Sequence, residues 1–417
     1  MRRRALSLFL CLVEALYGLS QSRQIAQTTD IRTNDTALVS SGTQLLPLDL
    51  NRVEHGAELM AVPAYIFPTH AFLKGHNATG KPIRSAFSAH VRYAFRYPES
   101  TAVGKFYGCP AQGVGAGLLR FGERRQVGSP FVFYLYQEAQ LARLSTRLTA
   151  RYEWNLGMSF GWHPYDSDAN PYNRTIGSRV NASLGASLYL DYALTKHIAL
   201  RSGILLNHYS NGNTAMPNAG LNTIGLRMGV VYRQASGMEK EAGPFAAGSV
   251  CPSFRPYVNY DVTVFGAWRR KNFYRGGEGF ASPCKYGVSG IQFAPMYNVS
   301  RRVRLGLSLD GVYDVSANLR TDSDTPERGS VSDRFALGLS GRAEFVMPFF
   351  IIGAGYGRHV LYGSSDVRGW YQVLTLKAAV THNAYLHVGY NLKDLKEPNY
   401  LMLGVGYRFN NRSPLRL

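Results

Sequence analysis

Period-two alternation is the feature of this 417-residue chain that most limits its fold. Apolar residues from Leu401 to Phe409 alternate with small or polar ones, and the segment from Val303 to Asp310 repeats the pattern. Such alternation puts apolar side chains on one face of a strand. After residue 20, no run reaches the roughly 18 apolar residues of a membrane-spanning helix. If the chain enters a membrane, it must therefore do so as a closed barrel, the other structure that satisfies the backbone in lipid.

The composition agrees with a strand-rich membrane protein. The chain has 27 Tyr, 21 Phe and 43 Gly, and its charged fraction is 18%, against about 25% in soluble proteins. Apolar residues outside and small or polar residues inside are typical of outer-membrane barrels. The aromatic Phe409 near the C-terminus resembles the closing-strand signal of such barrels. We therefore expect an all-β, antiparallel, transmembrane outer-membrane β-barrel.

Sixteen strands can be placed by working back from Phe409. Their connections alternate between short and long, as periplasmic turns and outer loops do. The turn that follows Ser210 then lies at the outer surface. Allowing for error, we expect about 12–16 strands, or alternatively an eight-stranded barrel plus a second β unit. The strands are expected near 57–66, 85–96, 112–120, 129–138, 145–162, 179–193, 196–210, 220–234, 255–268, 284–297, 301–314, 334–347, 349–361, 369–380, 384–393 and 400–409.

The remaining segments give the expected order of the chain. Residues 1–20 form a signal peptide, with Arg2 to Arg4 as its basic region and Ala5 to Val13 as its apolar core. Residues 21–56 are a flexible leader, 57–234 and 255–409 are two groups of strands, and 410–417 are a tail. Residues 235–254 are longer than a periplasmic turn, so they separate two smaller barrels or form a plug or cap. The cleaved protein is expected in the bacterial outer membrane.

The formal charge of +19 indicates an anionic partner. Nucleic acid does not suit an exported, strand-rich chain, so lipid phosphates are the better candidate. The alternative is that basic loops merely lie among anionic headgroups.

The cysteines predict no metal site. Cys11 leaves with the signal peptide, and Cys109, Cys251 and Cys284 remain, none of them in a CxxC pair. An odd number in an oxidising compartment predicts one disulfide and one buried thiol.

A histidine and a serine occur two residues apart, at His208 and Ser210, before a turn rich in Asn, Gly and Pro. On a strand this spacing puts both on one face, with Cα atoms roughly 7 Å apart. A hydroxyl next to an imidazole is the first requirement for a serine nucleophile. Both share a face with Ile204 and Leu206, and Asn222 on the next strand shares its face with Ile224 and Leu226.

This parity points all three polar side chains toward lipid. Such a placement is costly unless the groups are paired or functional, and a site that faces lipid suits a lipid substrate. The alternative is that they meet headgroups at the rim of the barrel.

The same residues resemble the PagL family of outer-membrane lipid A 3-O-deacylases. The matching strings are His208-Tyr209-Ser210-Asn211 and Pro217-Asn218-Ala219-Gly220. Upstream, residues 170–173 and 176–178 resemble a longer, deacylase-related branch of the family. The likeness covers roughly residues 110–235, and we expect none over 255–409.

The resemblance implies a serine esterase whose site lies on the outer wall of an eight-stranded barrel. Ser210 would be the nucleophile and His208 its general base, with Asn211 and Asn218 at the oxyanion hole. The family has a glutamate twelve residues after the serine, where this chain has Asn222. An amide can orient an imidazole but cannot stabilise the imidazolium by charge.

The implied substrate is lipid A, or lipopolysaccharide, in the outer leaflet, with one acyl chain lying against Ile204, Leu206, Ile224 and Leu226. No metal or organic cofactor is implied. Two other functions stay open. One is a channel whose many strands leave an aqueous lumen, and the other is a barrel that binds lipid A without cleaving it.

Residues 162–168 carry two further features. Trp162 and His163 are expected to anchor at the membrane interface. Asp166 and Asp168 lie in a predicted outer loop, where they are either solvated or bind a cation.

Overall fold

The structure, a computed structural model, describes residues 46–47, 53–98, 101–212, 214–234, 254–270, 272–275, 278–282, 284–319, 330–364, 368–394, 397–412 and 415–416. The predicted signal peptide, most of the predicted leader and all but the last residue of the predicted connector lie outside these residues. No helix among the described residues is long and apolar enough to cross a membrane.

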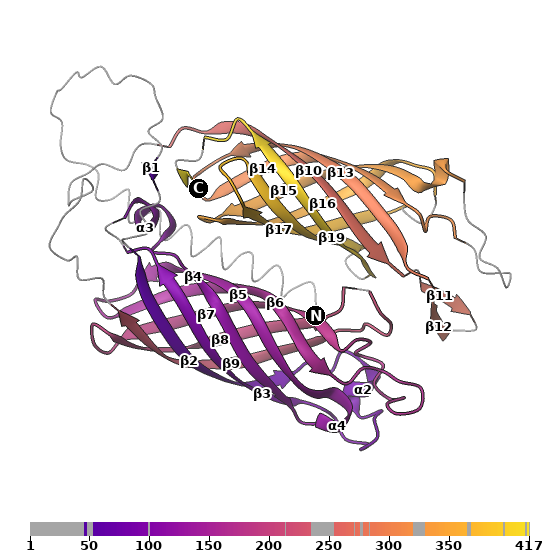
Figure 1. Cartoon of the computed structure of the whole chain (residues 1–417), viewed down its shortest axis with the longest axis horizontal. Coiled ribbons are helices and arrows are strands. Elements are labelled where there is room, and N and C mark those ends of the chain that lie inside the picture. Colours follow the sequence, from indigo (N-terminus) through magenta and orange to yellow (C-terminus); the bar gives the residue numbers. More distant parts are fainter. Residues whose placement is uncertain are drawn as a thin grey trace.

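The first barrel closes on itself after eight strands (Figure 1). Each strand pairs antiparallel with the next, and β9 pairs back with β2, so that Met60 lies opposite Gly229. The strands are β2 (Glu54–Ile66), β3 (Ser85–Arg96), β4 (Ala111–Phe121), β5 (Gly128–Arg143), β6 (Leu148–Trp162), β7 (Val180–Ala193), β8 (Ile198–Ser210) and β9 (Leu221–Gln234).

The second barrel also closes with eight strands. Its last strand pairs with its first, so that Val264 lies opposite Val405. The strands are β10 (Tyr257–Arg269), β13 (Tyr286–Asn298), β14 (Val303–Asp314), β15 (Phe335–Val346), β16 (Phe350–Tyr362), β17 (Trp370–Ala379), β18 (Ala384–Lys393) and β19 (Glu397–Phe409).

Short elements occupy the connections. The helices are α2 (Ala71–Lys74), α3 (Ala102–Tyr107), α4 (Arg124–Val127) and the 3-10 turn η2 (Ser332–Arg334). Two small sheets pair β11 (Asn272–Arg275) with β12 (Glu278–Ala281), and β1 (Leu46–Pro47) with β20 (Leu415–Arg416). In Figure 1, α2, α4 and the β11–β12 hairpin lie at one end of the two barrels and α3 lies at the other.

The all-β antiparallel barrel fold is confirmed, and the sixteen barrel strands fall within a few residues of the predicted ranges. They form two barrels of eight, which is the alternative given above, and not one large barrel. The reason is the pairing of the two edge strands, because β9 bonds to β2 and β19 bonds to β10.

The interior of each barrel is filled by paired charges. In the first barrel, Glu58 lies 2.8 Å from both Arg92 and Arg201. In the second, Asp261 lies 2.8 Å from Lys377 and from Arg408. Eight strands leave room only for side chains or one small ligand, so the wide aqueous lumen expected of a larger barrel is absent from the described part of the chain.

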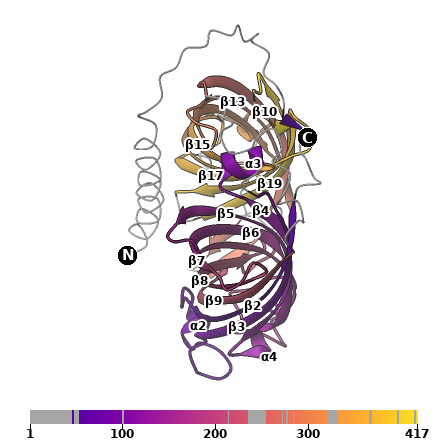
Figure 2. The same ribbon diagram turned by 90° about the vertical axis from the view of Figure 1, so that its left-hand side faces the viewer.

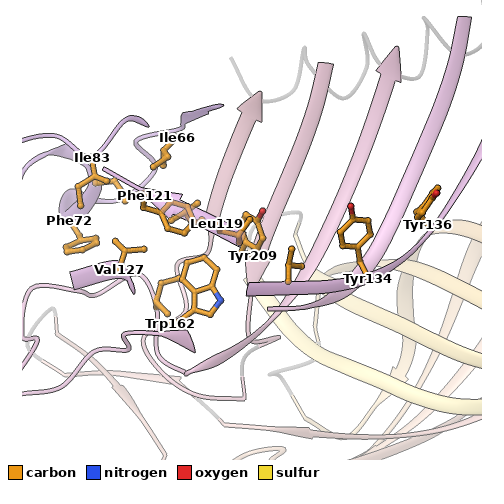
Figure 3. Close-up of a cluster of buried hydrophobic side chains, with 14 residues drawn as sticks. Ile66, Phe72, Ile83, Leu119, Phe121, Val127, Tyr134, Tyr136, Trp162 and Tyr209 are labelled. Carbon is orange, nitrogen blue, oxygen red and sulfur yellow. The ribbon is translucent and has the colours of Figure 1, made fainter. Parts of the chain in front are cut away.

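Apolar side chains close the end of the first barrel that carries α2 and α4 (Figure 3). Phe121 and Tyr209 pack against Trp162 with tilted rings, whose centroids lie 5.2 and 5.4 Å from that of Trp162. Trp162 is only 1% exposed, and its indole N–H donates to Ser159 Oγ at 2.8 Å. The prediction that Trp162 anchors at the interface is therefore wrong, because its ring lies in this core cluster. His163 is exposed, and its role as an interface anchor stays a prediction.

Of the three cysteines that follow the predicted signal peptide, the structure describes two. Cys109 is a buried free thiol and Cys284 is an exposed free thiol. These two do not form the predicted disulfide with each other, and Cys251 lies outside the described residues.

Candidate functional site

The candidate site lies at the turn end of the hairpin formed by β8 and β9. His208 is the direct cross-strand partner of Asn222 in the ladder. Residues that oppose each other on one face have Cβ atoms about 5 Å apart, within reach of a hydrogen bond between side chains. Ser210 is the last residue of β8, two positions beyond His208 on the same face. The antiparallel register thus brings together three residues that span fifteen positions of sequence.

The three side chains form a hydrogen-bonded row. His208 Nε2 lies 2.9 Å from Ser210 Oγ, and His208 Nδ1 lies 2.7 Å from Asn222 Oδ1. An amide oxygen can only accept, so the Nδ1 atom that faces it carries the proton. The opposite ring nitrogen, Nε2, then has a free lone pair directed at the serine hydroxyl. This is the protonation state that a general base needs before it takes a proton.

The row lies on the outward face of the barrel wall. The intervening residues Leu205 and Tyr209 point inward and are buried. On the outward face, Ile204, Leu206 and Leu226 are 53%, 40% and 50% exposed, and Ile224 is partly exposed. The four predicted acyl-contact residues therefore form an apolar strip on the wall, immediately below the polar row.

The turn after Ser210 brings Asn211 and Asn218 together. The backbone N–H of Asn211 donates to Asn218 Oδ1 at 3.1 Å, and the Asn211 side-chain amide donates to the carbonyl of Ala215 at 2.9 Å. The Asn211 N–H, which the sequence suggested as an oxyanion donor, is thus used within the turn. The same bond fixes the Asn218 amide with its oxygen toward the Asn211 N–H, so the NH2 group of Asn218 is directed away from that N–H.

Gly220 is a site residue to which the sequence reasoning gave no role. Its φ is +71°, and a Cβ atom at this position would lie 2.9 Å from His208 Cε1. Glycine adopts this backbone conformation without steric cost, and here it also leaves room for the imidazole ring. The signal was present, because Gly220 ends the second string that carries the family resemblance.

The loop between β6 and β7 supports the turn. Ile176 pairs with Asn218 in a β-bridge, and a Cβ atom at Gly177 would lie 2.3 Å from the carbonyl oxygen of Pro217. Asn173 is fully buried and donates to the carbonyls of Gln126 and His163 at 2.9 and 2.8 Å. The upstream strings found in the sequence therefore belong to the loop that packs under the candidate site.

The acidic residues of this loop form a local turn. Asp166 accepts the backbone N–H groups of Asp168 and Ala169 at 3.0 and 2.9 Å. These two hydrogen bonds lower the pKa of Asp166 below its usual value. Within the described residues, no group of three or more His, Cys, Asp or Glu side chains is arranged to bind a metal.

A hollow of about 810 Å³ lies elsewhere on the outer wall of the first barrel, and its lining includes Leu59, Ala61, Leu118 and Met228. The residues of the polar row are not part of its lining.

Two solved structures are similar to part of the chain. Neisserial surface protein A is 12% identical, covers 43% of this chain and 96% of its own, and has a TM-score of 0.30. The outer membrane enzyme PagL is 13% identical, covers 41% of this chain and 97% of its own, and has a TM-score of 0.28. At these scores the fold assignment rests on the strand pairing of the chain itself. No curated protein matches the chain.

Two protein-family models match the chain, one in each barrel. "Lipid A 3-O-deacylase (PagL)" matches residues 143–231, which include the polar row. "Acyloxyacyl hydrolase, C-terminal domain" matches residues 258–411, which span the second barrel. The expectation that the family likeness does not reach residues 255–409 is therefore wrong. Since the two matches together cover more than half of the sequence, the chain belongs to the PagL family of lipid A deacylases.

Proposed function

We propose that this protein is an outer-membrane serine esterase that removes an ester-linked acyl chain from lipid A. The observation that carries the proposal is the row Ser210–His208–Asn222, whose hydrogen bonds measure 2.9 and 2.7 Å and which opens onto the outward face of the barrel. A serine, a base and a group that orients the base recur in unrelated esterases and proteases because the chemistry needs all three.

The reaction begins with proton transfer from Ser210 to His208. As Oγ attacks the ester carbonyl, Nε2 takes the hydroxyl proton and a tetrahedral intermediate forms. The NH2 group of Asn218 stabilises the negative oxygen, and one such donor is typically worth ~3 kcal/mol. The imidazolium then gives its proton to the sugar oxygen, which leaves as an alcohol.

A water molecule completes the cycle. It attacks the acyl-serine while His208 takes one of its protons, and the fatty acid is released as Ser210 recovers its hydrogen. Asn222 keeps the proton on Nδ1 throughout, so that Nε2 is the nitrogen that exchanges protons. The acyl chain stays in the bilayer against the strip of Ile204, Leu206, Ile224 and Leu226, and the sugar lies at the rim.

Basic side chains at the same end of the barrel support an anionic lipid as the substrate. The loops around the site expose a group of cations that could meet phosphate groups of lipid A. These residues are Lys81, Arg84, Arg124, Arg125, Arg174 and Arg179.

The direct test is Ser210→Ala in cells that make the protein. In cells with the wild-type protein, we expect mass spectra of extracted lipid A to show loss of one acyl chain. In cells with the variant, we expect fully acylated lipid A. Heat-modifiable migration on gels controls for folding and membrane insertion. Identical spectra from wild type and variant, with both barrels inserted, would contradict the esterase proposal.

Asn222→Glu is a companion variant that tests the orienting group. The carboxylate would still accept from Nδ1 and would add charge stabilisation of the imidazolium, so we expect an equal or higher initial rate of deacylation. Asn222→Ala removes the acceptor, and we expect at least a tenfold lower rate. If glutamate abolished activity and alanine did not alter it, the orienting role of residue 222 would be lost.

Intact lipid A that co-purifies with wild type and is never cleaved would favour the second candidate, a barrel that binds lipid A. The amide at position 222 is the observation that favours this reading, because it lacks the charge of the family's glutamate.

A further inference from the structure

The turn of the candidate site touches the second barrel. Gly212, two residues beyond Ser210, is buried and has a φ of +63°. A Cβ atom at this position would lie 3.5 Å from Cβ and 3.8 Å from Cδ2 of Leu401. Leu401 belongs to β19, the last strand of the second barrel. A residue almost 190 positions away in sequence therefore covers the backbone of the turn that carries Ser210 and Asn211.

A second zone of contact joins the barrels near α3. The Trp154 ring packs edge-on against Phe350 with centroids 5.2 Å apart, and its N–H points to Met347 Sδ at 3.0 Å. Arg302 Nε donates to the carbonyl of Phe106 in α3 at 2.9 Å. Both views place the two barrels side by side (Figures 1 and 2). The contact at Gly212 is thus part of an extended interface between the barrels.

Exposure falls where the two barrels meet. On the outward face of β8, Ile204 and Leu206 are 53% and 40% exposed, whereas Ser210 is 8% exposed. On β19, Leu403 is 49% exposed, whereas Leu401 on the same outward face is only partly exposed. Ser210 and Leu401 are thus each less exposed than the outward residues two or more positions away on the same strand.

We propose that the second barrel completes the catalytic site, with Leu401 as a positioning residue that packs on Gly212 and holds the turn after Ser210. This inference rests on the proposed function. Gly212 has no side chain with which to restrict its own backbone, and glycine populates the left- and right-handed regions about equally. The same turn carries Asn211, whose backbone N–H orients Asn218. Misplacement of a reacting group by 1 Å can lower a rate by about a hundredfold. A contact from Leu401 that fixes the turn can therefore affect the rate of the reaction.

Disulfide crosslinking tests the contact independently of activity. Cys109, Cys251 and Cys284 are first replaced by serine, and Gly212→Cys is combined with Leu401→Cys. The Cβ separation of 3.5 Å suits a disulfide, whose Cβ atoms are usually about 3.5–4.5 Å apart. After cleavage at a protease site introduced between the barrels, the two halves should stay joined on a non-reducing gel. The matched control is Gly212→Cys with Leu403→Cys, which lies about 7 Å further along the strand and should crosslink poorly. Equal crosslinking of both pairs, or of neither, would overturn the contact.

Kinetics test the positioning role. We expect Leu401→Ala to lower kcat on lipid A about tenfold with KM within twofold of wild type, Leu401→Met to restore most of kcat, and Leu403→Ala to match wild type. An unchanged kcat in Leu401→Ala, with wild type active, contradicts the positioning role alone. An inactive wild type contradicts the proposed function and the positioning role together, while the crosslink still decides whether the barrels touch at this point.

Discussion

Asn222 and Gly220 set the position of the His208 ring from two sides. The amide oxygen of Asn222 accepts from Nδ1 at 2.7 Å, which fixes the tautomer of the ring. Gly220 leaves the space that the ring edge occupies, since any Cβ there would lie 2.9 Å from Cε1. At the scale of single residues, the proposed base is therefore positioned by its hydrogen bonds to Asn222 and Ser210 and by the space that Gly220 leaves for the ring.

Gly220→Ala should lower the deacylation rate at least tenfold while the barrel folds. The added methyl group pushes the imidazole away from Ser210 Oγ, and a left-handed φ adds strain for any residue with a Cβ. The measurement is the initial rate of fatty acid release from lipid A.

Gly80→Ala is the matched control for this prediction. Gly80 has a similar φ of +65°, but a Cβ atom there meets nothing within 4 Å. It carries the backbone strain without the clash, so its rate should stay near that of wild type. Equal losses in both variants would mean that strain, and not the position of the ring, explains the effect.

At the scale of elements, the site depends on segments that pack beneath it. The loop between β6 and β7 pairs with Asn218 and is fixed by the buried Asn173. Helix α2 covers the same end of the barrel, and Phe72 and Leu73 enter the apolar cluster of Figure 3. The short helix is capped by His70, the residue before it, whose Nδ1 accepts the N–H of Phe72 at 3.3 Å. These connections act as a platform for the hairpin of β8 and β9.

The cap at His70 should make α2 sensitive to acid. Burial, with Arg174 and Lys74 nearby, lowers the pKa of His70 below its usual 6.5, so the folded state favours the neutral ring that accepts from Phe72. The stability that this group contributes is present above pH 6.5 and is lost as the pH falls through the lowered folded pKa.

Hydrogen exchange at Phe72 and Leu73, corrected for intrinsic rates, should therefore quicken in acid. His70→Asn keeps a capping acceptor that does not titrate, so its corrected exchange should stay flat over the same range. If wild type and His70→Asn behave alike, the histidine does not set the pH response.

At the scale of the whole molecule, the chain forms two narrow barrels and not one wide barrel. Arg227, fully buried, lies 2.9 Å from Glu58 and 2.5 Å from Glu153, and ion pairs of this kind fill the first lumen. Removing one partner of a buried pair is costly because it leaves an uncompensated charge. The charged interior thus fills the lumen of the first barrel.

We expect no steady ion conductance when the purified protein is inserted into planar bilayers. Eight strands leave an interior that side chains fill, and those side chains are paired here. A pore-forming outer-membrane protein in the same bilayer serves as the positive control. Stable, voltage-independent conductance steps from wild type would show that the lumen opens and would support the alternative that the protein is a channel.

The sequence by itself determined where the strands lie and to which side of the barrel wall the side chains of the site point. Period-two alternation fixes which residues share a face, so the outward parity of His208 and Ser210 could be read without coordinates. The strings around residues 208–220 pointed to the family because the turn needs those residue types in that order. Neither inference required knowledge of distant contacts.

Only the tertiary structure decided how many barrels form and what surrounds the turn. Whether β9 pairs with β2 or with β10 depends on edge strands far apart in sequence, and alternation is the same in either case. The burial of Trp162 likewise follows from its packing against Phe121 and Tyr209, which are distant in sequence, and no local pattern encodes such contacts. The contact of Leu401 with the turn at Gly212 arises because two separately closed barrels lie side by side, and such proximity is a property of the folded molecule alone.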